Sequence, residues 1–121
     1  FQYDASENYA DTYSNSFLLI TDISGTAYTY AFLTSQPVIF ITPNENKLAN
    51  HNYDKLNFFL NRTKIGSIVR DVKLMSQEIN KILLKIKQYN ESIQMLSREI
   101  RYLGKSKKKF IEEINKLLFN N

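Results

Sequence analysis

The sequence contains no cysteine, one histidine (His51), three glycines and two prolines in 121 residues. The absence of cysteine excludes disulfide bonds and thiolate metal sites, and neither paired histidines nor clustered carboxylates offer another metal site. No run approaches the roughly 18 consecutive apolar residues that a membrane span needs, and the first residues do not resemble a signal peptide. We therefore expect a cytoplasmic protein that uses no metal and no cofactor.

The residues that are present have the composition of an ordinary globular domain. Hydrophobic residues make up 43% of the chain and charged residues 23%, which is typical of folded, water-soluble domains. A length of 121 residues corresponds to one domain at most. Because the sequence begins at Phe1 rather than at methionine, we interpret it as a partial domain of a longer protein.

The net charge of +4 conceals an uneven distribution along the chain. Residues 1–61 contain two basic and six acidic side chains, whereas residues 62–121 contain fourteen basic and six acidic ones. Such a split can mark a surface for nucleic acid or for anionic lipid. We interpret it as a solvated, lysine-rich helical face and expect no nucleic acid partner. If the lysine run at 105–109 acts at all, it would hold the protein on an anionic membrane.

Two unbroken apolar runs, Phe17–Thr21 and Val38–Ile41, predict neighbouring strands. Hydrophobicity that does not alternate is typical of strands buried on both faces, as in parallel sheets. Between the runs, Thr26–Ser35 predicts a helix, and its inner side would carry Ala27, Ala31 and Phe32. Two strands joined in this way should be parallel, with a right-handed crossover.

Weaker patterns predict the other elements before residue 70. Asp4 and Glu7 resemble a capping box that would open a helix near residues 6–14. A short helix is expected around residues 53–60, and Ile65–Val69 is a third candidate strand. Because three short parallel strands leave a sheet edge unpaired, we expect the preceding strands of the sheet upstream of this sequence.

The tail after residue 70 is predicted to be helical. Its apolar residues alternate spacings of three and four over 72–103 and again over 110–117, which taken alone suggests a coiled coil. Gly104 inside such a helix would cost about 1 kcal/mol relative to alanine, and the apolar stripe is wider than a coiled-coil seam. We therefore expect two or three separate helices, with Gly104 as a left-handed C-cap and Ser106 capping the next helix.

The densest group of candidate functional residues is Ser24, Gly25 and Thr26, where the first predicted strand gives way to a helix. The first backbone N–H groups of a helix are unpaired, and the helix dipole favours an anion beside them. Gly25 would let the backbone approach a phosphate, and the two hydroxyls add donors. A serine N-cap on an ordinary crossover helix explains the same spacing equally well.

The stretch Leu19–Phe32, followed by Gln36–Phe40, resembles the donor-binding segment of CDP-glycerol glycerophosphotransferases and related capsule enzymes. The similarity is good over residues 9–41. Those enzymes are transferases of the GT-B type, built from two Rossmann domains. The resemblance implies that this sequence comes from the C-terminal, donor-binding domain.

The resemblance also implies roles for individual residues. Ser24, Gly25 and Thr26 would contact the donor diphosphate, and Asp22 would order the turn. Thr29 would be the ribose contact, at a position where the family commonly has an acidic residue. Catalysis in the family is credited to histidines in segments that would lie upstream of this sequence, so His51 is expected to have no role.

The predicted fold class is therefore α/β: a truncated Rossmann-like domain with about three parallel strands, followed by C-terminal helices. Residues 1–70 would form the second half of a nucleotide-binding sheet, and residues 71–121 would form the helices, one of which Asn90 is a candidate to start. A coiled coil over 72–117, serving as a non-enzymatic interaction module, is the alternative.

The function implied by the resemblance is transfer of a glycosyl or glycerophosphoryl group to a cell-surface polymer of teichoic acid or capsule type. The donor would be a nucleotide-activated sugar or CDP-glycerol, and the acceptor a polymer or a lipid-linked chain. The enzyme would be cytoplasmic, at the inner face of the cell membrane, and this piece alone would be inactive. A UDP-sugar glycosyltransferase or a sugar epimerase on the same scaffold is the alternative enzyme.

Overall fold

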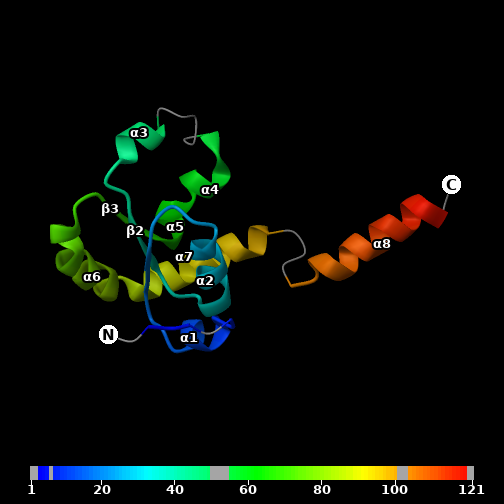
Figure 1. Cartoon of the computed structure of the whole chain (residues 1–121), viewed down its shortest axis with the longest axis horizontal. Coiled ribbons are helices and arrows are strands. Elements are labelled where there is room, and N and C mark those ends of the chain that lie inside the picture. The colour runs from blue at the N-terminus through cyan, green and yellow to red at the C-terminus, as the bar shows by residue number, and fades with distance from the viewer. Residues whose placement is uncertain (1–2, 6, 50–54, 101–103, 120–121) are drawn as a thin grey trace.

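The computed structural model describes residues 3–5, 7–49, 55–100 and 104–119. They form a mixed α/β fold in which a three-stranded parallel sheet is followed by helices (Figure 1), as predicted. The elements are α1 (Ala10–Ser14), β1 (Leu19–Thr21), α2 (Thr26–Thr34), β2 (Val38–Ile41), α3 (Glu45–Ala49), α4 (Asn57–Leu60), α5 (Arg62–Ile65), β3 (Gly66–Val69), the 3-10 turn η2 (Val72–Leu74), α6 (Met75–Leu84), α7 (Ile86–Glu99) and α8 (Ser106–Phe119). Among the described residues, no helix combines the length and apolar character that crossing a bilayer requires.

The strands lie in the order β1-β2-β3, and both neighbouring pairs are parallel. In the central strand, Val38 is paired with Leu19 of β1 on one side and with Gly66 of β3 on the other. The predicted succession of strand, helix and parallel strand is therefore confirmed, and so is the third strand. Because the strands are parallel, their carboxyl ends share one edge of the sheet.

The two apolar runs differ in burial. Val38, Ile39 and Phe40 of β2 are fully buried, as predicted. The prediction that the first run is buried on both faces was wrong, because Phe17 is 58% exposed and Ile20 is 44% exposed. β1 is shorter than the run and pairs only with β2 among the described residues, so an unbroken apolar run here marks an edge strand.

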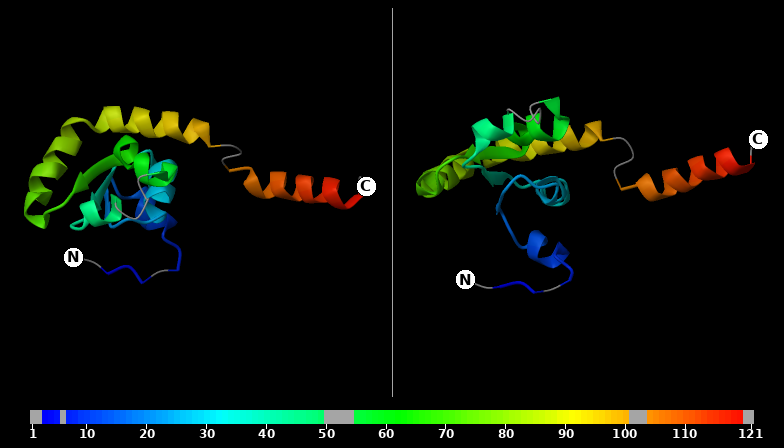
Figure 2. Two further views of the ribbon diagram at one scale, coloured as in Figure 1. Left: turned by 90° about the horizontal axis from the view of Figure 1, so that it is seen from above. Right: turned by 45° about the horizontal axis from the view of Figure 1, so that its top comes forward.

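Helices cover the two faces of the sheet unequally. On one face, α2, α5 and α7 pack against β2, and their shared core consists of Ala27, Tyr30, Ala31, Val38, Phe40, Ile65, Ile93 and Leu96. On the other face, α6 packs over a smaller cluster of Ile39, Val69 and Ile82. α6 and α7 meet at an angle, so that they wrap around the sheet (Figure 2).

The tail forms separate helices, which confirms the prediction against one uninterrupted helix. The first break falls at Lys85 rather than before Asn90. Asn90 starts no helix, because it lies inside α7. Its side-chain amide donates to the Ser35 carbonyl at 2.5 Å and so ties α7 to the end of α2. Gly104 is left-handed, with φ of 72°, and α8 begins at Ser106 as expected. α7, however, ends at Glu99, before Gly104.

The heptad-like pattern of the tail has two different structural meanings. In α6 and α7, its buried members include Ile82, Ile93 and Leu96, which pack against the sheet. In α8 the same pattern continues at Phe110, Ile114 and Leu117, which are all exposed. Figure 1 shows α8 standing apart from the sheet and its covering helices. Unlike those of α6 and α7, the apolar residues of α8 belong to neither buried cluster of the described residues.

The N-terminal helix is shorter than predicted. α1 begins at Ala10, whose N–H donates to the Asn8 side chain at 3.1 Å, so the Asp4–Glu7 capping box does not open it. Asp4 instead accepts a hydrogen bond from Thr12.

Candidate functional site

The predicted turn lies at the carboxyl edge of the parallel sheet. β1 ends at Thr21, and α2 begins at Thr26, after a turn that contains Ser24 and Gly25. α2 has no acidic side chain in its first turn, so no first-turn carboxylate offsets the positive end of the helix dipole. In parallel α/β sheets this edge, where strands give way to helices, is the usual position of phosphate sites.

Hydrogen bonds occupy several of the N–H groups at the start of α2 that were expected to be unpaired. The Ser24 hydroxyl oxygen accepts from the Thr26 N–H at 3.2 Å, so that donor is occupied. The Gly25 N–H has no hydrogen-bond partner among the described residues. A hydroxyl that accepts a hydrogen bond keeps its own hydrogen as a donor. The turn therefore offers an anion the Gly25 N–H and the two hydroxyls of Ser24 and Thr26.

The backbone conformation at position 25 does not require glycine. Its φ of −60° is accessible to any residue, and a Cβ built on it would meet no atom within 4 Å. The absence of a side chain therefore leaves open space beside the Gly25 backbone, at the start of α2. Such space allows a ligand to approach the backbone, as proposed for the turn from its sequence.

The two other predicted residues flank the turn. Asp22 is exposed and accepts a hydrogen bond of 3.4 Å from the Thr21 hydroxyl. The side-chain hydrogen bond across the turn is accepted by Ser24, not by Asp22. Thr29 is exposed on the outer side of α2, and its N–H donates to the Gly25 carbonyl.

A pocket of about 240 Å³ lies beside the turn, where the chain leaves β1 and β2. It is lined by Asp22, Ile23, Ile41, Thr42, Pro43, Asn44 and Leu48. The Thr42 hydroxyl is buried without a well-formed hydrogen bond, although it lies near enough to Glu45 to help lower the pKa of that carboxyl. Buried polar atoms without partners are uncommon, and this one belongs to a residue that lines the pocket.

A buried ion pair that the sequence did not reveal holds this side of the fold together. Arg62 of α5 donates to both carboxylate oxygens of Glu45 in α3, at 2.5 and 3.1 Å, and its Nε donates to the Phe59 carbonyl at 3.0 Å. Its guanidinium lies 3.6 Å from the centre of the Phe59 ring. Hydrogen bonds from Arg62 hold the pKa of the Glu45 carboxyl below its ordinary value.

An aromatic groove of about 300 Å³ lies between α2, α4 and the end of α7. It is lined by Tyr28, Phe32, Asn57, Phe58, Asn61, Leu96, Glu99 and Ile100. The Tyr28 ring centre is 5.9 Å from that of Phe32 and 5.8 Å from that of Phe58. Burial raises the pKa of Tyr28 to about 12, so its hydroxyl stays protonated and donates to the Phe58 carbonyl.

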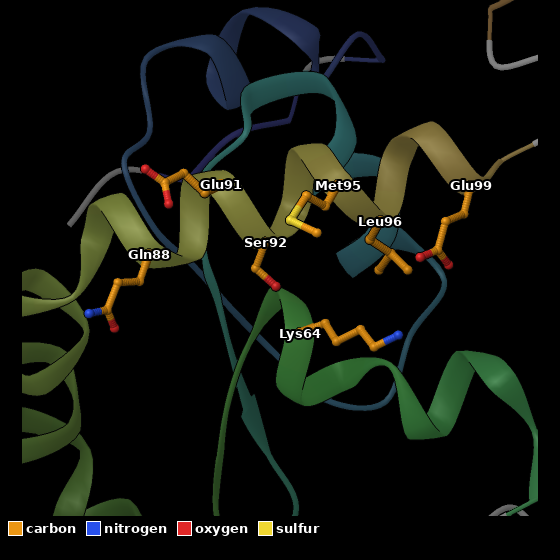
Figure 3. A pocket seen from close by; sticks show the side chains of 7 residues that line it. All are labelled: Lys64, Gln88, Glu91, Ser92, Met95, Leu96 and Glu99. Carbon is orange, nitrogen blue, oxygen red and sulfur yellow. The ribbon is translucent and has the colours of Figure 1, made fainter.

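A third pocket, of about 350 Å³, lies on the neighbouring side of α7 (Figure 3) and is lined by Lys64, Gln88, Glu91, Ser92, Met95, Leu96 and Glu99. Lys64 comes from α5 and lies beneath Leu96, whereas Glu91 points away from it. Among the described residues, Lys64 forms no ion pair with Glu91 or Glu99.

The described residues contain no group of three His, Asp or Glu side chains placed to hold a metal ion. His51 lies outside the described residues. Comparison of the chain with protein-family models, curated proteins and solved structures gives no match.

Proposed function

We propose that this chain is the donor-binding part of a transferase that uses a nucleotide-activated donor, and that Ser24, Gly25 and Thr26 hold the donor diphosphate. The observation that carries the proposal is the position of this turn, at the N-terminus of α2 and at the carboxyl edge of a parallel sheet. There the Gly25 N–H has no partner within the described part of the chain, and the first turn of α2 has no carboxylate that would repel an anion. The neighbouring pocket, with its buried Thr42 hydroxyl, provides room for the group beyond the phosphates.

The chemistry of such a site is electrostatic. Donors fixed before the reaction stabilise the negative charge that develops on the departing nucleotide, and they need no reorganisation. The group transferred would be glycosyl or glycerophosphoryl, and the acceptor a surface polymer or a lipid-linked chain. The general base and acceptor site would come from other parts of the protein.

Replacing Gly25 with valine should weaken donor binding at least about tenfold, because its side chain would fill the space in front of the helix N-terminus. The fold should survive, since no atom lies within 4 Å of the new Cβ and φ is unstrained. Replacing Ser24 with alanine should cost about 1 kcal/mol of binding, or more if its hydrogen bond is to a charged oxygen. Calorimetry of the whole protein with CDP-glycerol, UDP-sugars and pyrophosphate measures both effects.

The matched control is Leu33→Ala, which changes an exposed residue of the same helix, 65% accessible, two turns from the site. Its donor affinity should equal that of the parent. If Gly25→Val and Ser24→Ala also bind every donor like the parent, the turn only caps α2 and the proposal is wrong. The donor preference in the same panel separates a CDP-glycerol enzyme from a UDP-sugar transferase or epimerase.

A second proposal concerns α8, which we infer to be a contact with an anionic membrane. Every residue of α8 except Lys109 is exposed. One side presents an apolar stripe formed by Phe110, Ile111, Ile114, Leu117 and Leu118. On the polar side, Lys109 and Lys116 pair with glutamates of the same helix, so the excess positive charge lies at the lysine-rich start. A basic amphipathic helix of this kind fits the surface of an anionic bilayer.

The protein should therefore sediment with vesicles containing phosphatidylglycerol, and bind phosphatidylcholine vesicles much more weakly. Each lysine near the surface contributes about 1 kcal/mol, so binding should fall as salt screens the charges. Leu117→Glu should abolish the binding because it places a charge in the apolar stripe, whereas Glu112→Gln on the polar side should retain it. Equal binding to both kinds of vesicle would instead mean that the stripe binds lipid without a preference for charge. A dimer in light scattering that Leu117→Glu dissociates would mean that the stripe binds a second copy of the chain.

A further inference from the structure

The aromatic groove lies on the same flank of α2 as the phosphate turn. Gly25, Tyr28 and Phe32 follow one another at spacings of three and four, which places them along one side of a helix. A rise of about 1.5 Å per residue puts Tyr28 about 4.5 Å and Phe32 about 10 Å along the axis from Gly25. A ligand with phosphates at Gly25 can therefore extend along this flank into the groove.

We propose that the aromatic groove binds the nucleoside of the donor, with the base against Tyr28 and Phe58 and the ribose hydroxyls on Glu99. This inference rests on the proposed function, because the diphosphate at Gly25 sets where the nucleoside begins. It names the residues that hold the nucleoside end of the ligand.

The aromatic side chains form a surface suited to a planar ring. Tyr28 and Phe58 come from different helices, and the hydrogen bond from the Tyr28 hydroxyl to the Phe58 carbonyl fixes their relative position. Leu96 is 5% exposed and closes the groove with an apolar surface. Stacking on aromatic rings suits every base, because each base has a π-face.

The polar residues of the groove match the edges of a nucleoside. Asn57 and Asn61 line it with amides, which both donate and accept hydrogen bonds, as base edges do. Glu99 is the only carboxylate among the residues that line the groove, and it is exposed. An ionised carboxylate only accepts hydrogen bonds, which suits the adjacent hydroxyls of a ribose.

The experiment compares the affinities of CDP, UDP, 2′-deoxy-CDP and inorganic pyrophosphate for the whole protein. Phe58→Leu keeps an apolar side chain but removes the ring. It should therefore lower the affinity for CDP and UDP about tenfold and leave the affinity for pyrophosphate unchanged. Glu99→Gln should remove most of the preference for CDP over 2′-deoxy-CDP. Glu91→Gln, on the same helix but lining only the pocket of Figure 3, should bind all four ligands like the parent.

The outcomes distinguish this inference from the proposed function. If nucleotides and pyrophosphate bind but Phe58→Leu and Glu99→Gln leave their affinities unchanged, the groove is not the nucleoside site, while the phosphate turn stands. If nucleotides bind through the groove but pyrophosphate does not bind, the groove is supported and the phosphate turn is wrong. If no ligand binds, both are wrong. If Phe58→Leu fails to fold, the test depends on Glu99→Gln, which changes an exposed residue. Its loss or retention of the preference for CDP over 2′-deoxy-CDP then decides whether the groove is the nucleoside site.

Discussion

Alanine at position 66 is expected to destabilise the protein by about 3 kcal/mol or more, at the upper end of the usual range for overpacking. Gly66 pairs with Val38 in the parallel ladder of β2 and β3. A Cβ on Gly66 would overlap the Val38 carbonyl oxygen and lie 2.6 Å from the carbonyl carbon. Those atoms belong to the backbone of the central strand, so relief requires the two strands to separate. Urea unfolding followed by circular dichroism measures the loss.

Gly25→Ala is the matched control for this change. At Gly25 a Cβ has open space and φ is negative, so its free energy of unfolding should change by less than about 1 kcal/mol. If Gly66→Ala is as stable as Gly25→Ala, then β3 does not approach β2 as closely as described. The comparison separates the steric effect from the general effect of removing a glycine.

The sheet could be predicted from the sequence because its signals are local. The run Val38–Ile41 matches β2 residue for residue, and Thr26–Ser35 differs from α2 by one residue. Each element shows its own unbroken pattern, and a helix between two apolar runs favours parallel pairing. The position of a strand within the sheet is not local, and for that reason the exposed edge at Ile20 was mistaken for a buried strand.

The tail shows the same division between local and long-range information. Its helices have clear apolar spacing, but spacing does not indicate what an apolar stripe contacts. Ile93 is buried against the sheet and Leu117 is exposed on α8, although both belong to one pattern. Likewise Asn90 has the chemistry of a helix cap, yet it caps α2 across 55 residues of sequence rather than its own helix.

The candidate site was predictable only where it lies in one continuous segment. The turn at Ser24 and Gly25 carries small and hydroxyl residues between a strand and a helix, so the sequence locates it. The aromatic groove combines Tyr28, Phe58 and Glu99 from three helices, and no spacing in the sequence relates them. The same holds for Glu45 and Arg62, which look like ordinary surface charges until the fold buries them together.

Removing one partner of this ion pair is expected to cost about 3 kcal/mol of stability. Breaking a buried pair costs about 3 to 5 kcal/mol because a charge is left without compensation, and the lower end applies because the Glu45 side chain is still 11% exposed. Glu45→Gln leaves the buried guanidinium of Arg62 without its carboxylate. Arg62→Met leaves Glu45 unpaired and also removes the hydrogen bond to Phe59. Replacing both with methionine should recover much of the loss, since no charge stays buried.

The pair should also make stability depend on pH in acid. Arg62 lowers the folded-state pKa of Glu45 from an ordinary value of 4.5, so the unfolded chain takes up the proton first as the pH falls. The stabilisation is therefore complete above about pH 5 and declines as the pH falls through 4.5 toward the lowered folded-state pKa. Glu45→Gln has no such proton to gain, so its free energy of unfolding should fall less between pH 6 and about pH 3.

Denaturant unfolding of the parent and Glu45→Gln across that range tests this. Two curves that stay parallel would show that the Arg62 contact does not stabilise the ionised carboxylate, whereas curves that converge toward acid would support it. Glu113, whose pKa is also lowered, is present in both proteins and cancels in the comparison.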